Sequence, residues 1–216
     1  MTPTHHPELD ELMAYASGVS PEWMSLVIAC HLTYCEVCRE DVAAFDDIGG
    51  ALLSSLPVEG PALELPKGLE LPDTTEPRVK PPSQRVVADV PGLPRPILPY
   101  LANTPNFRFL APGVQHVPLT LSVNDVPARL VRFKPEFEVP EHSHAGLETI
   151  LVLEGEFEDL TTAERYRTGD ISRRDGTAMH KTRITSADPC TALMIGTALS
   201  EPKTFWGRMA QILTKV

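Results

Sequence analysis

Long apolar runs are missing from this sequence. None of its stretches approaches the ~18 consecutive apolar residues that a membrane-spanning helix needs. The first residues, MTPTHHPELDELM, also lack the basic and the apolar segments of a secretory signal peptide. We therefore expect a cytoplasmic protein with no membrane partner. Its four cysteines are then expected to be thiols or metal ligands and not a disulfide framework.

Basic residues are almost absent from the first 60 positions. This segment contains ten acidic residues and a single basic one, Arg39, so its charge is −9, compared with −10 for the whole chain. Such a surface repels nucleic acid, which argues against a DNA-binding zinc finger, and attracts a basic partner. Charge alone favours the simpler interpretation, a solvated acidic face that has no partner.

Apolar residues recur at helical spacing in the first 55 residues. The pattern predicts helices over residues 7–17, 20–34 and 36–55. Gly18 fits the end of the first helix and Pro21 fits the first turn of the second, because glycine favours helix C-termini and proline is tolerated at helix N-termini. A small helical bundle is therefore expected at the start of the chain.

Proline dominates the middle of the chain. Twelve of the 22 prolines lie within residues 57–105, which predicts an extended linker. Residues 93–101 (LPRPILPYL) form either a short helix that docks elsewhere or an apolar stretch of this linker. From about residue 106, short β-rich runs separated by Gly, Pro and Asp predict a sandwich or barrel. Residues 205–216 are interpreted as a terminal helix or tail.

A first set of candidate metal ligands lies in the acidic segment. His31, Cys35 and Cys38 are spaced to lie on one side of a helical corner, and two thiolates with an imidazole are typical of structural zinc. An antiparallel second helix returns to the level of the chain start near residue 31. His6 is therefore the expected fourth ligand, with His5 as its rival.

This ligand set resembles the zinc anti-sigma domain. The match consists of His6, a 24-residue gap, and then His31-Leu-Thr-Tyr-Cys35-Glu-Val-Cys38. The resemblance implies a zinc-stabilised helical domain over residues 1–102, in which LPRPILPYL is a fourth helix. It also implies a partner, an extracytoplasmic-function sigma factor, whose access to RNA polymerase the domain blocks.

A second candidate set follows in the β-rich half. His142 and His144 point to one face of a strand, and Glu148 returns to that face after a short turn. His180 is the expected fourth ligand, while Glu141 is a rival to Glu148. Three nitrogens and one oxygen suit zinc, iron, manganese or nickel.

The spacing of this second set resembles the two cupin motifs. Asp175 and Thr177 depart from the second motif, where proline and glycine are usual. The resemblance implies a cupin β-barrel of the jelly-roll type over residues 103–216. A zinc anti-sigma domain followed by a cupin is similar to the ChrR-type anti-sigma factors. That family implies two zinc sites and no enzymatic activity. It also implies release of a sequestered sigma factor under oxidative stress such as singlet oxygen, with the cupin as sensor.

An alternative function remains open from the residues. A cupin dioxygenase or isomerase with a helical zinc-binding appendage would use the same second ligand set. No separate acid, base or nucleophile stands in a recognisable arrangement, so no catalytic residue is assigned. Cys30 and Cys190 are interpreted as core thiols, Cys30 with a capacity for redox reactivity.

Overall fold

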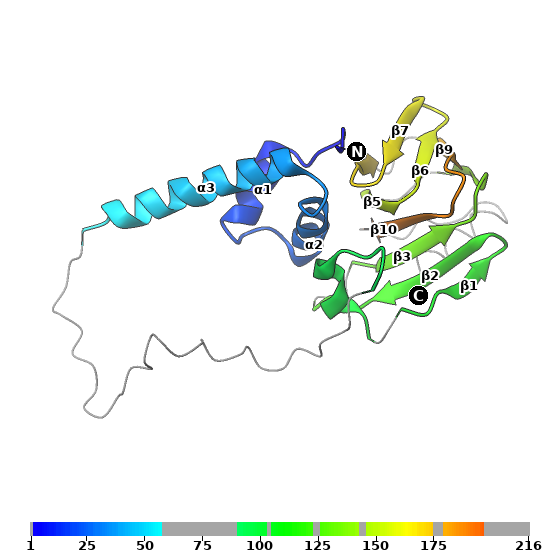
Figure 1. Ribbon diagram of the computed structural model, residues 1–216, viewed down its shortest axis with the longest axis horizontal. Coiled ribbons are helices and arrows are strands. Elements are labelled where there is room, and N and C mark those ends of the chain that lie inside the picture. The colour runs from blue at the N-terminus through cyan, green and yellow to red at the C-terminus, as the bar shows by residue number, and fades with distance from the viewer. Residues whose placement is uncertain are drawn as a thin grey trace.

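The computed structural model describes residues 2–57, 90–102, 105–122, 126–142, 146–174 and 179–196. Helices come first and antiparallel sheets follow, as Figure 1 shows. The helical elements are α1 (Leu9–Ala16), α2 (Glu22–His31), α3 (Glu36–Ser55) and the 3₁₀ helix η1 (Arg95–Tyr100). None of the helices in these ranges is long and apolar enough to cross a membrane.

The helix boundaries follow from local chemistry. The Glu8 backbone amide donates to the Glu11 carboxylate at 2.8 Å at the start of α1, and Gly18 ends that helix with a φ of +73°. The Cys35 sulfur accepts from the Cys38 amide at 3.5 Å and caps α3. The three predicted helices are confirmed, and Gly49 and Gly50 do not interrupt the third.

The second half of the chain forms two antiparallel sheets. Their strands are β1 (Arg108–Ala111), β2 (Val114–Leu119), β3 (Ala128–Phe133), β4 (Glu138–His142), β5 (Glu148–Glu154), β6 (Glu156–Asp159), β7 (Glu164–Arg167), β8 (Ile171–Arg174), β9 (His180–Ile184) and β10 (Cys190–Gly196). The six-stranded sheet has the order β1-β2-β3-β10-β5-β8 and the four-stranded sheet the order β4-β9-β6-β7.

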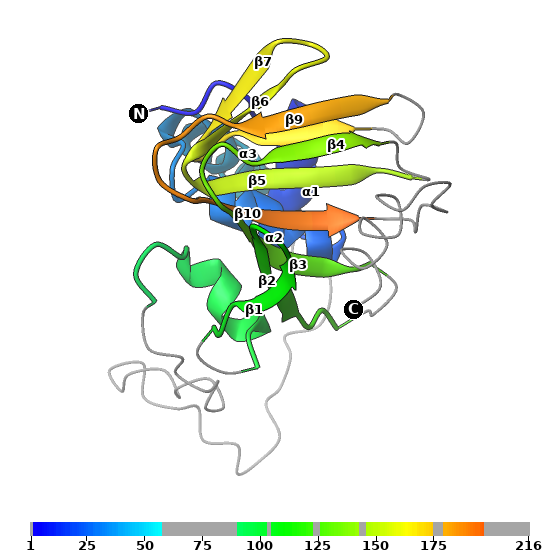
Figure 2. The ribbon, with the colours of Figure 1, turned by 90° about the vertical axis from the view of Figure 1, so that its right-hand side faces the viewer.

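The expected closed barrel needs correction. In the described ranges the two sheets have separate edges and share no hydrogen-bonded strand pair, so the architecture is two packed sheets. Figure 2 shows these sheets in front of the helices. The physical reason is that, among the described strands, the ladder from β5 passes to β8 and stops there, while β4 pairs only with β9.

Side chains of the six-stranded sheet alternate between two cores. On β3, Val131 faces the four-stranded sheet and packs in the core between the sheets. Leu130 faces the opposite way and packs in a core with Leu26 and Val27 of α2. The sheet is therefore covered on one face by the second sheet and on the other by helices, which explains why β3 and β10 are buried at nearly every position.

The apolar island in the proline-rich segment docks on this shared core. Residues 95–100 form η1, and Ile97 and Leu98 are buried there with Leu26 of α2. The Thr120 amide donates to the Tyr100 carbonyl oxygen at 3.0 Å. The docked-helix alternative is thus confirmed. Residues 58–89 of the expected linker and the expected terminal helix at 205–216 lie outside the described residues.

Candidate metal centres

The four predicted ligands of the first centre lie together. His6 comes from the extended segment before α1, His31 from the last turn of α2, and Cys35 and Cys38 from the cap and first turn of α3. One ligand atom from each lies within 4.8 Å of the others. The Cys35 and Cys38 sulfurs are 3.3 and 3.4 Å from His6 Nδ1, and His31 Nε2 is 3.3 Å from the Cys38 sulfur.

This geometry fits a tetrahedral zinc ion. Bonds of about 2.1 Å to nitrogen and 2.3 Å to sulfur place neighbouring ligand atoms roughly 3.6 Å apart. His31, Cys35 and Cys38 are buried, whereas His6 is exposed. Burial raises the pKa of the Cys38 thiol and lowers that of His31, so without an ion both groups favour their neutral forms. A bound cation would instead stabilise the thiolate.

A turn from the β-rich half completes this centre. Nδ1 of His31 donates to the Gly169 carbonyl oxygen at 2.7 Å, which leaves Nε2 unprotonated and facing the sulfurs. The Asp170 carboxylate accepts from the Thr4 and His5 amides at 2.6 and 2.9 Å, and the Ile171 amide donates to the His5 carbonyl oxygen at 3.2 Å. The segment that carries His6 is therefore positioned by the β7–β8 turn.

The rival ligand His5 points elsewhere. Its ring lies against Tyr166 with a centroid distance of 4.4 Å, and its Nδ1 is 3.5 Å from the Asp170 carboxylate. Sequence reasoning did not identify Gly169 or Asp170 as part of this centre. Neither residue lies near the ligand motif in sequence, and a Gly-Asp pair is an ordinary turn signal.

Three of the four predicted ligands of the second centre also lie together. His142 of β4, Glu148 of β5 and His180 of β9 each place one ligand atom within 4.8 Å of the others. The His142 and His180 residues are cross-strand partners, with ring centroids 4.4 Å apart. Nδ1 of His142 donates to the Pro140 carbonyl oxygen at 2.8 Å, so Nε2 can act as the ligand atom. His144 lies outside the described residues.

A buried, ion-paired carboxylate lies next to the second centre. Glu141 is exposed and does not join the cluster. Asp159 is buried, with a carboxylate oxygen 3.7 Å from His180 Nδ1, and it pairs with Arg174 at 2.7 Å. Burial by itself would raise the pKa of the Asp159 carboxyl. The backbone amides of Thr161 and Thr162, which donate to it, and the positive charge of Arg174 outweigh burial and lower this pKa. Asp159 thus remains ionised beside the candidate ligands.

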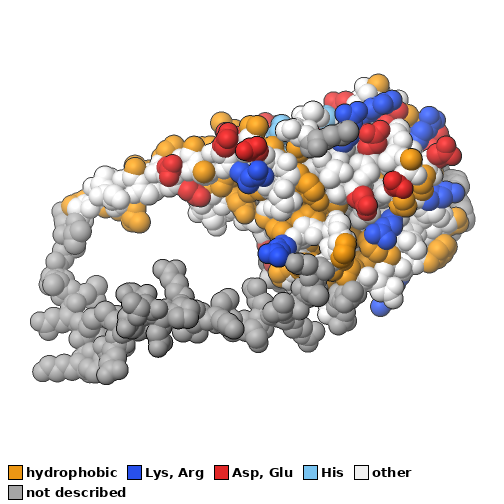
Figure 3. All heavy atoms as spheres, viewed as in Figure 1, with side chains coloured by type: hydrophobic (Ala, Val, Ile, Leu, Met, Phe, Trp, Pro, Cys, Tyr) orange, Lys and Arg blue, Asp and Glu red, His pale blue; other side chains and the backbone are white. Residues whose placement is uncertain are grey.

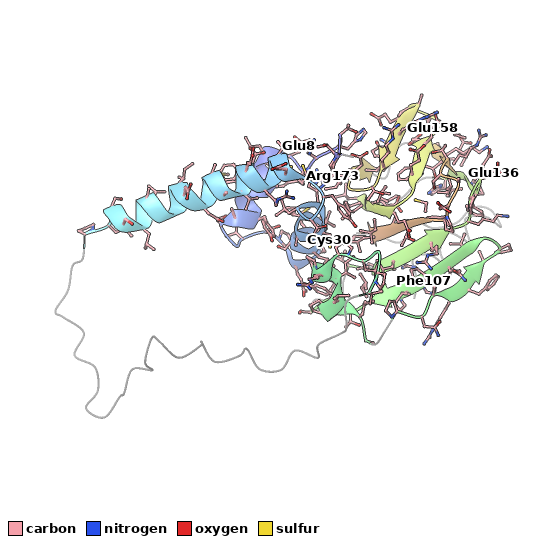
Figure 4. The ribbon with its side chains drawn as sticks, in the orientation of Figure 1. Glu8, Cys30, Phe107, Glu136, Glu158 and Arg173 are labelled. Atoms are coloured by element: carbon pink, nitrogen blue, oxygen red, sulfur yellow. The ribbon has the colours of Figure 1, made fainter. Side chains whose placement is uncertain are left out.

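The basic residues around His180 do not form an open anion-binding mouth. Arg173 pairs with Glu11 at 2.6 Å, and it lies where helices and sheets meet, as labelled in Figure 4. Lys181 and Arg183 both pair with Glu138. Each of these three cations therefore has a carboxylate partner.

The two remaining cysteines are buried and belong to no ligand cluster among the described residues. Cys30 packs between α2 and the six-stranded sheet, and Cys190 packs between the two sheets. Burial raises the pKa of Cys30 strongly and raises that of Cys190 to about 12. Both are therefore unreactive core thiols at neutral pH.

Comparisons with known proteins identify the family. Residues 102–199 match the model of the ChrR Cupin-like domain. The anti-sigma-E factor ChrR of Cereibacter sphaeroides is 34% identical over 187 residues, which cover 83% of each protein. A chain of the crystal structure of Rhodobacter sphaeroides SigE in complex with the anti-sigma ChrR is 32% identical. It matches with a TM-score of 0.66, over 90% of this chain and 100% of that one. The chain therefore belongs to the ChrR family of anti-sigma factors.

Proposed function

We propose that this protein sequesters an extracytoplasmic-function sigma factor in the cytoplasm. The observation that carries the proposal is the match over 90% of the chain to a structure of SigE in complex with ChrR. Because the match includes both the helices and the sheets, it supports a shared mode of action and not merely a shared cupin fold. The activity proposed is regulatory, with no catalytic step.

The exposed part of α3 suits a protein partner. This helix extends away from the sheets in Figure 1, and Figure 3 shows apolar and acidic side chains along it. Four of its large apolar residues are more than half exposed: Val37, Ile48, Leu52 and Leu53. Exposed apolar side chains of this density are typical of interfaces, and the acidic neighbours favour a basic partner.

The first metal centre is inferred to hold zinc through His6, His31, Cys35 and Cys38. Two thiolates, two imidazoles, tetrahedral spacing and burial all favour this ion. Zinc there supplies folding energy to a helical unit whose own core is small. We assign this unit, with η1, to residues 1–102, and the cupin to residues 103–216.

The second centre is inferred to hold a zinc ion through His142, His144, Glu148 and His180 and to sense the stress. Glu148 lies on β5, whose neighbour β8 begins at Ile171, directly after Asp170. A change at the second centre can therefore reach the turn that holds His31 and the His6 segment. Release requires that this change favour the unbound form of the protein.

The test is copurification followed by stress. The full chain is expressed together with each extracytoplasmic-function sigma factor of its native cell in turn. One of these sigma factors is expected to co-elute with the chain at moderate salt. Photosensitised singlet oxygen should then release the sigma factor from the wild-type protein and not from His142→Ala. If no sigma factor co-elutes, the proposed partner is wrong. If His142→Ala releases normally, the second centre is not the sensor.

A further inference from the structure

An arginine is buried between the two sheets without a full set of partners. Arg129 on β3 is 4% exposed, and its Nη1 atom has no hydrogen-bond partner among the described residues. Its neighbour Leu130 faces the helices and Val131 faces the second sheet, so alternation along the strand places Arg129 between the sheets. Its cross-strand neighbours are the apolar residues Pro118 and Met194.

A buried histidine on the adjacent strand shares this face. His116 on β2 is 6% exposed and is the cross-strand partner of Val131, so it also points between the sheets. Its Nδ1 has no hydrogen-bond partner in the described part of the chain. Burial and then the charges of Arg129 and Arg108 lower the His116 pKa, so the ring is neutral and one of its nitrogens can donate a hydrogen bond.

These two groups lie on the same inner face as the second metal centre. Glu148 and Ile150 of β5 point between the sheets, and Ile150 pairs with Met194, which pairs in turn with Arg129. Burial lowers the pKa of Arg129 to about 10, although the negative charge of Glu148 acts to raise it. The guanidinium therefore stays protonated at neutral pH. Arg129 is therefore a buried cation beside the centre.

The charges of this interior favour an anion. A divalent ion held by Glu148 and histidines carries one net positive charge, and Arg129 adds a second. A buried charge without a partner is costly, and a planar guanidinium pairs best with a carboxylate or another oxyanion. The apolar flanks supplied by Ile150 and Met194 suit carbon atoms better than a fully polar ion.

We propose that the inter-sheet core of this protein binds a small organic carboxylate through the side chains of Arg129 and His116. The guanidinium forms charge-assisted hydrogen bonds to the carboxylate oxygens, His116 donates one more, and the carbon chain lies against Ile150 and Met194. The site is separate from the surface of α3, and its test does not involve a sigma factor.

The experiment uses the zinc-loaded full chain and sodium acetate, propionate and butyrate as probes. Binding affinity is measured by titration calorimetry and the melting temperature by thermal unfolding, both at constant ionic strength. Sodium chloride and sodium phosphate are the comparison salts. The wild-type protein is expected to bind at least one of the carboxylates and to melt higher in its presence than in chloride. Arg129→Met should weaken this binding at least ten-fold, whereas Arg165→Met, at an exposed arginine of β7, should leave it unchanged.

The same variant separates ligand binding from a structural role. Without carboxylate, Arg129→Met should keep its zinc and melt at or above the wild-type temperature, since it removes a buried charge. If it loses zinc or unfolds, Arg129 is a structural partner of Glu148 and the proposal is wrong. His116→Phe provides a second variant, expected to weaken binding several-fold with zinc retained. Equal responses of wild type and both variants, or binding of phosphate alone, would also overturn the proposal.

Discussion

His31 donates a hydrogen bond from Nδ1 to the carbonyl oxygen of Gly169, 138 positions away in the sequence, at 2.7 Å. One residue is a candidate zinc ligand at the end of α2 and the other lies in the turn between β7 and β8. The bond selects the tautomer that presents Nε2 to Cys38. The two halves of the protein therefore meet at the first metal centre.

Gly169→Ala should disturb the first centre. Gly169 has a φ of +94°, and an added Cβ would lie 2.6 Å from Pro3 Cγ and 2.8 Å from Tyr34 Cβ. Strain and displacement of the neighbouring segment should lower the free energy of unfolding by about 3 kcal/mol and weaken zinc retention. Calorimetry and zinc release to a chelator measure these effects. The control is Gly18→Ala, at a φ of +73° with open space around it, which should cost roughly 1 kcal/mol and leave zinc unaffected.

Asp170→Asn should loosen the segment that carries His6. The two carboxylate oxygens of Asp170 accept from the amides of Thr4, His5 and Arg167, and an asparagine amide group must oppose one of these donors. The expected cost is ~1–3 kcal/mol, with faster amide exchange at residues 4 and 5. Asp188→Asn, at an exposed position, serves as the control. Unchanged exchange at residues 4 and 5 would contradict the assigned role.

Cys35→Ser and Cys38→Ser should each remove one zinc ion per chain. Because the helical unit depends on its metal, each change should lower stability by roughly 3 kcal/mol or more. Metal analysis and thermal unfolding provide the measurements. Cys30→Ala is the matched control, since Cys30 is equally buried but lies outside the ligand cluster, and it should keep its zinc. Full zinc content in the Cys35 and Cys38 double variant would show that the ion binds elsewhere.

Leu53→Asp should weaken sigma-factor binding without unfolding the protein. Leu53 is 72% exposed on α3, so a carboxylate there remains in water in the free protein. We expect it to lose that water only in the complex, at a cost in binding free energy. The expected loss is at least ten-fold in affinity, about 1.4 kcal/mol. Phe109→Asp changes an equally exposed residue, 74%, on β1 of the β-rich half and should leave affinity unchanged. Equal losses in the two variants would indicate a non-specific effect of charge.

Glu148→Gln changes a candidate ligand of the second metal centre, and we expect it to loosen contacts at the first metal centre as well. The substitution weakens metal binding on β5, and β5 pairs with β8, which follows Asp170 directly. Amide exchange at Ile171, which donates to His5, is expected to rise about ten-fold. Glu158→Gln, on β6 of the other sheet, should not change it. If exchange at Ile171 responds to neither variant, the two centres are not coupled along this path.

The sequence alone predicted the local features correctly. Three helices and the strand-rich second half follow from short-range spacing, since helical and strand periods are determined by residues close in the chain. The two ligand sets stay predictions, although the described members of each set lie together. The exposure of the helices was less predictable. Met13 and Leu52 have core spacing, yet they are more than half exposed, because periodicity identifies an apolar face and not the element that covers it.

Only the tertiary structure decided how the two halves combine. The sequence suggested two modules joined by a linker, whereas Leu26, Ile97 and Leu130 share one core. The contacts of Gly169 and Asp170 with the first centre, and the burial of Arg129 between the sheets, arise from residues far apart in the chain. Such contacts depend on which face of each strand is covered and by what. Helical and strand periods determine the two faces of an element, but only packing determines the partner of each face.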